Sequence, residues 1–279
     1  MEKHRMFRNF FLAFEWTSLK EVWQYRELFF FLVWRDIKIR YKQTVLGVLW
    51  AIIQPLSTML VFTIFFGRLA NLPNDGIPYP IFYYSALLPW IYFSTSISLS
   101  GNSLISNTDL VTKVYFPRVI IPAASVLAGV VDYVIGSTIL ILMIWLYPET
   151  GFSFAILLWP VLLAPLVLFA ISVGMILSAL NVSFRDIKYT IPFIIQLWLF
   201  LSPVIYPASM VEERLGENFR FLFDLNPVVG IIEAFRVTVI PGRSIDWGAF
   251  LISITVISIV FVLATLFFHK AERRFADLI

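Results

Sequence analysis

One ionisable side chain, that of Asp132, lies well inside an apolar stretch long enough to cross a membrane. A carboxylate at that depth could relay a proton or contact a substrate, or it could anchor neighbouring helices through hydrogen bonds. Its neighbours at four-residue spacing, Ala124, Ala128 and Gly136, form a stripe of small residues that is typical of a helix packing face. We therefore expect Asp132 to point into protein or a wet cavity, and we favour the anchor over the relay.

Other reactive residue types are scarce. The chain has no cysteine, and its two histidines, His4 and His269, lie at opposite ends of the sequence, so we expect no metal site. There is no GxSxG or HExxH pattern, and no glycine is followed by lysine, which excludes a phosphate-binding loop. Carriers driven by protons or sodium ions usually have intramembrane carboxylates and internal repeats, so a single intramembrane carboxylate argues against such coupling. We predict that the chain is not an enzyme and that energy for any uphill transport comes from another polypeptide.

The composition excludes a soluble protein. The 279 residues are 59% hydrophobic and 14% charged, with a mean hydropathy of +0.85, whereas soluble chains are about 25% charged. The net charge of +3 arises from 21 basic and 18 acidic residues, which also argues against a disordered chain or a nucleic-acid binder. The chain is predicted to be an all-α integral membrane protein.

Six charge-poor windows could each hold one membrane helix of about 20 residues. None is long enough for two spans and a turn. A second stripe of small residues, Ala170, Gly174 and Ser178, predicts close helix packing in the fourth window. The windows are residues 43–67, 76–108, 119–148, 150–184, 189–211 and 247–268.

The positions of Lys and Arg predict the orientation. Sixteen lie in the segments on the side of the two termini, and five lie in the segments on the other side. Because basic residues gather on the cytoplasmic side, we expect both termini to be cytoplasmic.

The first 42 residues do not read as a cleavable signal, because charges are scattered through them. Apolar residues recur at helical spacing, which predicts an amphipathic helix at the membrane interface. It could be a surface anchor only, or it could also present a docking surface to a cytoplasmic partner. The residues of this pattern are Phe7, Phe11, Phe14, Leu28, Phe31, Leu32 and Arg35.

Residues 207–246 are too short and too charged for two more crossings. Asn226 followed by Pro227 predicts a helix cap and first turn, and Glu233 and Arg236 could pair on the helix expected over residues 227–240. With Ser202, Pro203 and Pro207 breaking the fifth span before it, this segment predicts short re-entrant or outer-surface helices. Broken backbone at membrane depth favours a transport path nearby, although a simple external cap is the alternative.

Four segments carry a resemblance to a known family. The run from Trp34 to Trp50, followed by Gln54, Pro55 and Leu56, resembles the start of the first span in permeases of type-two ABC exporters for polysaccharides. That family includes the O-antigen (Wzm-type) and teichoic acid export permeases. The other similar segments are residues 107–122 around Phe116, Pro117 and Arg118, residues 181–186 with Phe184, Arg185 and Asp186, and Asn226 and Pro227 through Arg236.

The resemblance runs from about residue 20 to the C terminus and implies a homodimer bound to two copies of a separate ABC ATPase. It implies a coupling helix within residues 108–118, between the second and third spans, and a second ATPase contact before residue 43. Asn107 could cap the coupling helix and Pro117 could end it, although a plain connecting loop is the alternative. The implied ATPase-coupling residues are Thr108, Asp109, Lys113, Phe116, Pro117, Arg118, Arg35 and Asp36.

The resemblance also implies function and location. It implies export of a lipid-linked glycan across the bacterial inner membrane through a channel between the two copies, with ATP and Mg bound by the ATPase and no cofactor in this chain. Asn226, Pro227, Glu233 and Arg236 would belong to a periplasmic gate. We expect one permease domain, made of the interfacial region 1–42, the membrane domain 43–269 and the tail 270–279.

Aromatic rings suit sliding contact with sugar rings, so some could line the channel, although most aromatic residues of such a chain face lipid or pack helices. Another substrate, such as a lipid, teichoic acid or drug, is the first alternative, and a partner-free channel or membrane enzyme is the second. The channel-lining candidates are Phe62, Phe65, Phe66, Trp90, Phe193, Trp198 and Phe200.

Overall fold

The computed structural model describes residues 20–42, 47–147, 154–240 and 242–275, and this part of the chain is all-helical. The helices are α2 (Arg26–Tyr41), η1 (Gly47–Leu49), α3 (Trp50–Phe62), η2 (Thr63–Leu69), α4 (Tyr79–Ser106), α5 (Thr108–Lys113), α6 (Ile120–Ala128), α7 (Val130–Leu146), η4 (Phe154–Leu158), α8 (Trp159–Ser183), α9 (Ile187–Phe200), α10 (Ser209–Leu215), α11 (Glu217–Asp224), α12 (Pro227–Val237) and α13 (Trp247–Glu272).

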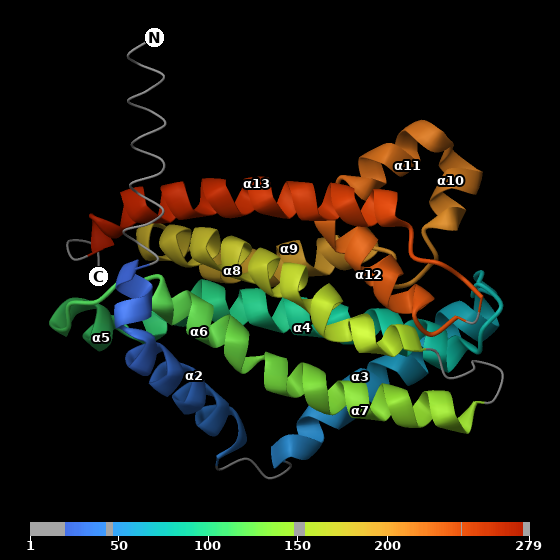
Figure 1. The fold of residues 1–279 in the computed structure, drawn as a ribbon, viewed down its shortest axis with the longest axis horizontal. Helices are drawn as coiled ribbons and strands as arrows, with labels where there is room; N and C mark the ends of the chain where they lie inside the picture. The colour runs from blue at the N-terminus through green and yellow to red at the C-terminus, as the bar shows by residue number, and fades with distance from the viewer. Residues whose placement is uncertain (1–19, 43–46, 148–153, 241, 276–279) are drawn as a thin grey trace.

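The long helices form one elongated bundle (Figure 1). Helix α4 lies at its centre and packs most extensively on α8, and it also contacts α3, α6, α7 and α12. Helix α13 covers α8, and α2 lies outside α6. The start of α2, the short α5 and the end of α13 share one end of the bundle, which we call the α5 end. Helices α10 to α12 lie toward the opposite end, the α12 end.

Both predicted stripes of small residues sit at close helix contacts. A Cβ atom built on Gly174 of α8 would lie 2.1 Å from Ser100 Oγ of α4, and one built on Gly136 of α7 would lie 2.5 Å from Leu88 Cδ1. At Gly174 the built Cβ would also lie 2.7 Å from Ser100 Cβ, so glycine permits the close approach of α8 to α4, whereas at Gly136 the atom met is the end of the flexible Leu88 side chain. The predicted packing role of the two stripes is confirmed.

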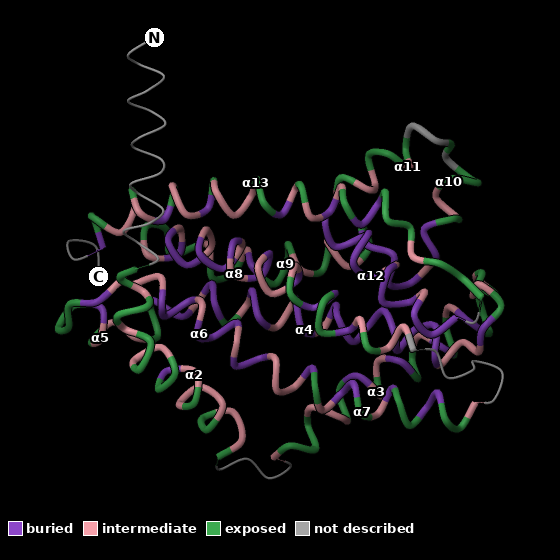
Figure 2. The backbone as a smooth tube through the Cα atoms, in the orientation of Figure 1, coloured by how far each residue is buried: buried purple, intermediate pink, exposed green. Residues whose placement is uncertain are grey.

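Four helical stretches of the described residues are long and apolar enough to cross a membrane, namely Gly47–Leu69, Ile120–Leu146, Ala155–Ser183 and Trp247–Glu272. They coincide with four of the six predicted windows. The other two windows hold α4 and α9, which fall outside this set. Helix α4 has 28 residues but is rich in serine and tyrosine, most of which are buried against its neighbours (Figure 2), and α9 has only 14 residues.

A second, smaller core lies at the α5 end. Its buried side chains include Leu32 of α2, Val111 of α5, Phe116 in the segment after α5, and Phe268 of α13. The larger core fills the rest of the bundle around α4 and α8. The α5 end is therefore packed as a unit that includes α2 and the end of α13.

Helix α2 differs from the expected amphipathic helix. Phe31 is exposed whereas Leu32 is buried, so the predicted apolar residues do not share one face, and the exposed side also carries Phe30 and Trp34. The side toward α6 carries Asp36, whose carboxylate accepts from the Ser125 hydroxyl at 3.0 Å. Tertiary contacts of the charged residues override the local pattern here. Phe7, Phe11 and Phe14 lie outside the described residues.

Candidate functional site

Helix α5 presents its charges outward from a buried base. The Lys113 ammonium donates to Asp109 Oδ1 at 2.7 Å, and the two side chains are 72% and 88% exposed. Between them Val111 points into the second core, and Phe116 follows it there. A short helix held in this way can offer Thr108, Asp109 and Lys113 to another molecule without leaving the bundle.

The predicted cap of α5 is wrong. The Asn107 side chain makes no cap hydrogen bond, and its amide donates instead to the Ser103 carbonyl of α4 at 2.8 Å. Only Asn107 separates α4 from α5, and its side chain bonds to the last turn of α4 instead of capping α5. Helix α5 ends at Lys113, before Pro117.

Arg118 ties the segment after α5 to the last helix. Its backbone N–H donates to Glu272 Oε1 at 3.0 Å, and its guanidinium donates to the Glu272 backbone carbonyl at 2.8 Å. Residues 154 positions apart in the chain are thereby joined. Displacement of α5 would be felt at the end of α13.

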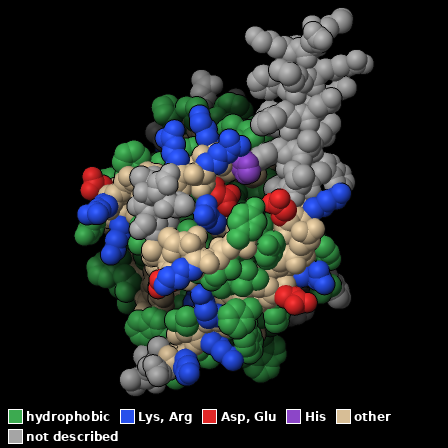
Figure 3. All heavy atoms as spheres, turned by 90° about the vertical axis from the view of Figure 1, so that its left-hand side faces the viewer, with side chains coloured by type: hydrophobic (Ala, Val, Ile, Leu, Met, Phe, Trp, Pro, Cys, Tyr) green, Lys and Arg blue, Asp and Glu red, His purple; other side chains and the backbone are tan. Residues whose placement is uncertain are grey.

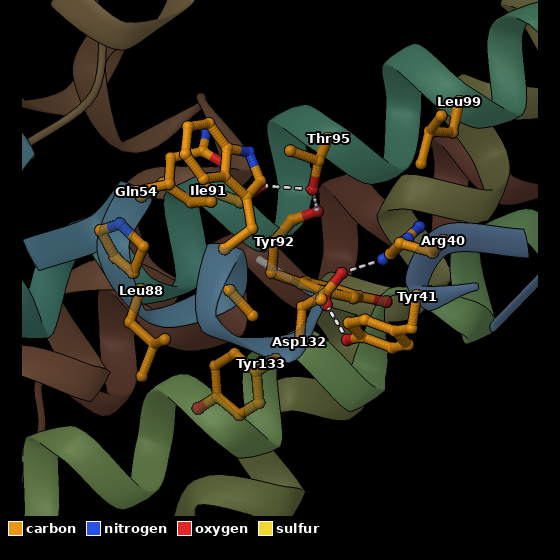
Figure 4. A pocket seen from close by; sticks show the side chains of 14 residues that line it. Arg40, Tyr41, Gln54, Leu88, Ile91, Tyr92, Thr95, Leu99, Asp132 and Tyr133 are labelled. Atoms are coloured by element: carbon orange, nitrogen blue, oxygen red, sulfur yellow. Dashed lines mark hydrogen bonds and ion pairs between the residues drawn. The ribbon is translucent and has the colours of Figure 1, made fainter. Parts of the chain in front are cut away.

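Asp132 is paired with the end of α2. Its two carboxylate oxygens accept from the Arg40 guanidinium and the Tyr41 hydroxyl, and these side chains point toward one another in Figure 4. One helix turn earlier, Asp36 accepts from Arg35 at 2.8 Å. The polar side of α2 is thus held by α6 and α7, as expected for the anchor that we favoured for Asp132.

A cavity of about 440 Å³ adjoins this cluster. Arg40, Tyr41 and Asp132 form one polar part of its lining, Gln54 of α3 and Thr95 of α4 add further polar groups, and Leu88 and Ile91 of α4 are among the apolar side chains (Figure 4). Such a cavity suits a molecule with a polar group and an apolar body.

The aromatic candidates for channel lining are divided by the structure. Phe65, Phe193 and Phe200 are exposed on α9 and on the end of the α3 stretch. Trp90 is buried inside the bundle, and Trp198 packs edge-on against Phe93 and Phe169. Phe62 and Phe66 pack edge-on against each other beside the larger core.

The predicted cap of α12 is confirmed. Asn226 Oδ1 accepts from the Val228 N–H at 3.2 Å and also from the Trp198 indole N–H at 3.0 Å. The Asn226 amide donates to the Leu201 carbonyl at 2.9 Å. One side chain therefore fixes the start of α12, beginning at Pro227, against the end of α9.

Arg236 is completely buried at the α12 end. Its guanidinium donates to Glu233 Oε1 at 2.6 Å, which confirms the predicted pair, and also to the Pro203 carbonyl. It lies 4.1 Å from the centroid of the Phe82 ring. Glu233 Oε1 in turn accepts from the Ala208 N–H at 3.1 Å. The chain between α9 and α10 is thereby held by a charge on α12.

Two further ion pairs lie near the α12 end. Arg243 contacts Asp75 at 3.1 Å, which joins the α3–α4 loop to the segment before α13. Arg220 contacts Asp224 at 3.1 Å on α11, and burial raises the pKa of the Asp224 carboxyl although Arg220 beside it opposes the rise.

Sequence reasoning missed the partners of these residues. No pattern links Arg40 and Tyr41 to Asp132, which lies about 90 positions away, and none links Glu272 to Arg118. The signal for Arg40 was limited to its charge at the start of an apolar window. Among the described residues, no group of His, Asp and Glu side chains could hold a metal ion.

Comparison with known proteins gives the family. The ABC-2 type transporter family matches residues 27–240. The chain is 30% identical over 262 residues to the O-antigen export system permease protein RfbA of Myxococcus xanthus, covering 93% of this chain and 98% of that protein.

Two further relatives are more distant. RfbA of Klebsiella pneumoniae is 27% identical over 250 residues, covering 88% of this chain and 92% of the relative. The polysialic acid transport protein KpsM of Escherichia coli is 25% identical over 244 residues, covering 86% and 90%. All three matches extend across most of both chains. This chain therefore belongs to the ABC-2 type transporters, as a multi-pass membrane permease and not as an ATPase.

Proposed function

We propose that this chain is the transmembrane subunit of an ATP-driven exporter of lipid-linked polysaccharide in the bacterial inner membrane. It works as a homodimer with two copies of a separate ABC ATPase, which bind ATP and Mg. The observation that carries the proposal is α5, an exposed charged helix on a buried base, in a chain similar along 93% of its length to an O-antigen export permease.

The α5 end supports the docking role. Asp109 and Lys113 are free to exchange their mutual pair for pairs with a partner, because exposed ion pairs contribute little stability. Val111 and Phe116 would carry the resulting movement into the second core, and Arg118 would carry it to α13. Arg35 and Asp36 lie on α2, which packs on the same core.

The exposed apolar surfaces support the homodimer. In α3 only Pro55 and Met59 are buried, and in α9 only Ile191 is. Phe65 of η2, which continues α3, and Phe193 and Phe200 of α9 are exposed and are the channel-lining candidates that we retain. We leave Trp90 out, since it is inside the bundle.

Six spans with both termini in the cytoplasm complete the proposal. Helix α4 crosses at the centre of each copy, where its polar residues are covered by other helices. Helix α9 is about 21 Å long, shorter than a hydrocarbon core of about 30 Å, and the chain from Leu201 to α10 completes that span. Helices α10 to α12 form the periplasmic gate, held by Asn226, Glu233 and Arg236, and the whole chain forms one permease domain.

In the proposed mechanism the chain contributes no chemistry of its own. Closure of the ATPase pair displaces α5, the two copies separate along α3 and α9, and the glycan passes between them against aromatic rings. Asp132 holds α2 in place throughout.

A deletion strain tests the substrate. Cells lacking this protein should accumulate lipid-linked glycan inside, and the purified chain in mild detergent should carry an ATPase subunit. Reversing the charges at Asp109, Lys113 and Arg118 together should abolish export. If the ATPase is present but no glycan accumulates, a lipid, teichoic acid or drug is the substrate; if no ATPase co-purifies and the reversals leave export intact, the exporter proposal fails.

A further inference from the structure

A second and larger hollow shares no lining residue with the Asp132 cavity. It has a volume of about 730 Å³ and runs between the start of α2, the segment after α5, and helices α8 and α13. Phe29, Ala123, Ile171 and Phe261 are among the apolar side chains in its walls. We call it the α8–α13 groove.

The length of the groove corresponds to one leaflet of a bilayer. Its lining on α13 runs from Phe261 to Arg273, which is about 18 Å of helix. Half of the hydrocarbon core is about 15 Å thick. An acyl chain could therefore lie in the groove along its whole length with its headgroup at the α5 end.

The rim at the α5 end carries two arginines, two acids and His269, and Arg118 and Glu272 already bond each other. Arg118 and Arg273 line it, and Lys and Arg side chains gather on this face of the molecule (Figure 3). Glu272, also on the rim, already accepts from the Arg118 N–H. Arg273 is exposed and has no ion pair among the residues that the structure describes. Glu21, on the other wall, is the remaining acid of the lining.

We propose that the α8–α13 groove binds an anionic phospholipid, with the phosphate at Arg273 and an acyl chain along Phe261 and Ile171. Arg273, which has no ion pair among the described residues, is a basic side chain at the mouth of an apolar groove, and basic residues near the membrane surface attract acidic lipid headgroups. The bound lipid contacts the segment from Phe116 to Arg118, so it steadies the junction between α5 and the last helix. This proposal needs neither the exported substrate nor the ATPase, so its failure and that of the export function are distinguishable.

Photocrosslinking tests the site on the full chain. The protein is reconstituted in phosphatidylcholine vesicles that contain phosphatidylglycerol with a photoreactive acyl chain, and labelled peptides are identified by mass spectrometry. Labels are expected on the α13 peptide around Phe261 and the α8 peptide around Ile171. The same label on phosphatidylcholine should react several-fold less. Equal labelling by the two lipids would overturn the proposal.

Two matched pairs of variants sharpen the test. Arg273→Gln should lower phosphatidylglycerol labelling about fivefold, because one basic residue near an acidic headgroup contributes that factor, whereas Arg274→Gln, one residue away and outside the lining, should not. Thr265→Phe should fill the groove and block labelling by either lipid. Thr255→Phe changes an exposed threonine of the same helix and serves as its control.

Size-exclusion chromatography of each variant shows that a lost label does not reflect a misfolded chain. Equal labelling of Arg273→Gln and Arg274→Gln would overturn the headgroup assignment. Unchanged labelling of Thr265→Phe, or lipid labelling that disappears when an ATPase partner is bound and crosslinks to the groove, would overturn the lipid as its occupant.

Discussion

Arg236 at the α12 end is fully buried, whereas Asp109 and Lys113 at the α5 end are 88% and 72% exposed. Each belongs to an ion pair within one helix, so the local sequence pattern is almost the same. The surroundings differ. Arg236 also donates to the Pro203 carbonyl and lies over Phe82, while Asp109 and Lys113 bond each other in open surroundings.

The difference indicates which of the two ion pairs can be exchanged for contacts with another molecule. Removing one partner of a buried ion pair strongly destabilises the folded protein, because the other charge is left buried and unpaired. The contacts of such a pair therefore hold one geometry. An exposed pair contributes about 0 to 1 kcal/mol and can be exchanged for another at little cost. We infer that the α12 end is built to keep its shape and the α5 end to receive another protein. Four substitutions test this contrast.

The largest effect is expected for Arg236→Met. It leaves Glu233 without its buried partner and frees the Pro203 carbonyl, so the free energy of unfolding should fall by about 3 to 5 kcal/mol. Denaturation of the full chain in mild detergent measures it. Arg214→Met, an exposed arginine of the same region, is the control. Adding Glu233→Gln should recover part of the loss, and a loss below about 1 kcal/mol for Arg236→Met would break the contrast.

Asp132→Asn should destabilise the chain less. Hydrogen bonds to charged groups contribute about 1.5 to 3 kcal/mol, and Arg40 and Tyr41 would both lose a charged acceptor. Asp186→Asn, at an exposed carboxylate, is the control for the same denaturation measurement. A double-mutant cycle with Arg40→Gln should give a coupling energy of similar size. If export stops while stability is unchanged, Asp132 is a relay and not an anchor.

Asn226→Ala should cost about 1 kcal/mol, the usual effect of losing a helix N-cap. Asn107→Ala is the matched comparison, because Asn107 also precedes a helix but does not cap it, and its effect should be smaller. Asn226→Asp should lie between wild type and alanine, since it keeps the acceptor for Val228 and Trp198 but loses the donor to Leu201. Equal effects of the two alanine variants would show that the cap does not fix α12.

The smallest effect on stability is expected for Lys113→Glu. The exposed pair with Asp109 is worth less than about 1 kcal/mol, so unfolding in detergent should hardly change. ATPase activity of the assembled transporter, measured with lipid-linked glycan, should nevertheless lose its stimulation. Lys113→Arg, which keeps the charge, should retain it. If Lys113→Glu lowered the free energy of unfolding but kept the glycan-stimulated ATPase activity, the exposed pair would serve stability and not contact with the ATPase.

The local features of the α12 end could be predicted from the sequence. The cap at Asn226 and the pair of Glu233 with Arg236 depend on residues at most three positions apart, and helix geometry fixes such contacts. The helical windows were also predictable, because charge-poor stretches follow from the cost of charge in a bilayer. Helix α4 shows the limit of this logic, since its serines and tyrosines are accommodated by burial inside the bundle.

Contacts between distant segments could not be predicted. Asp132 was correctly expected to face protein, but the sequence gives no reason to choose Arg40 and Tyr41 as its partners. The same holds for Arg118 with Glu272. The Asn107 cap failed because two roles competed for one side chain, and the preceding helix took it. Burial of Trp90 depends on how several helices pack around α4, and the order of residues within α4 does not encode that packing.

The pairing of α2 with α6 and α7 has a consequence for how the protein is made. Asp36 and Arg40 emerge from the ribosome about 90 residues before Ser125 and Asp132, which is roughly 5 to 20 s at ordinary synthesis rates. During that interval α2 has aromatic residues that favour lipid and charges that favour water, so it must wait at the membrane surface. Helix α2 thus reaches its final place only after the third predicted span has been inserted.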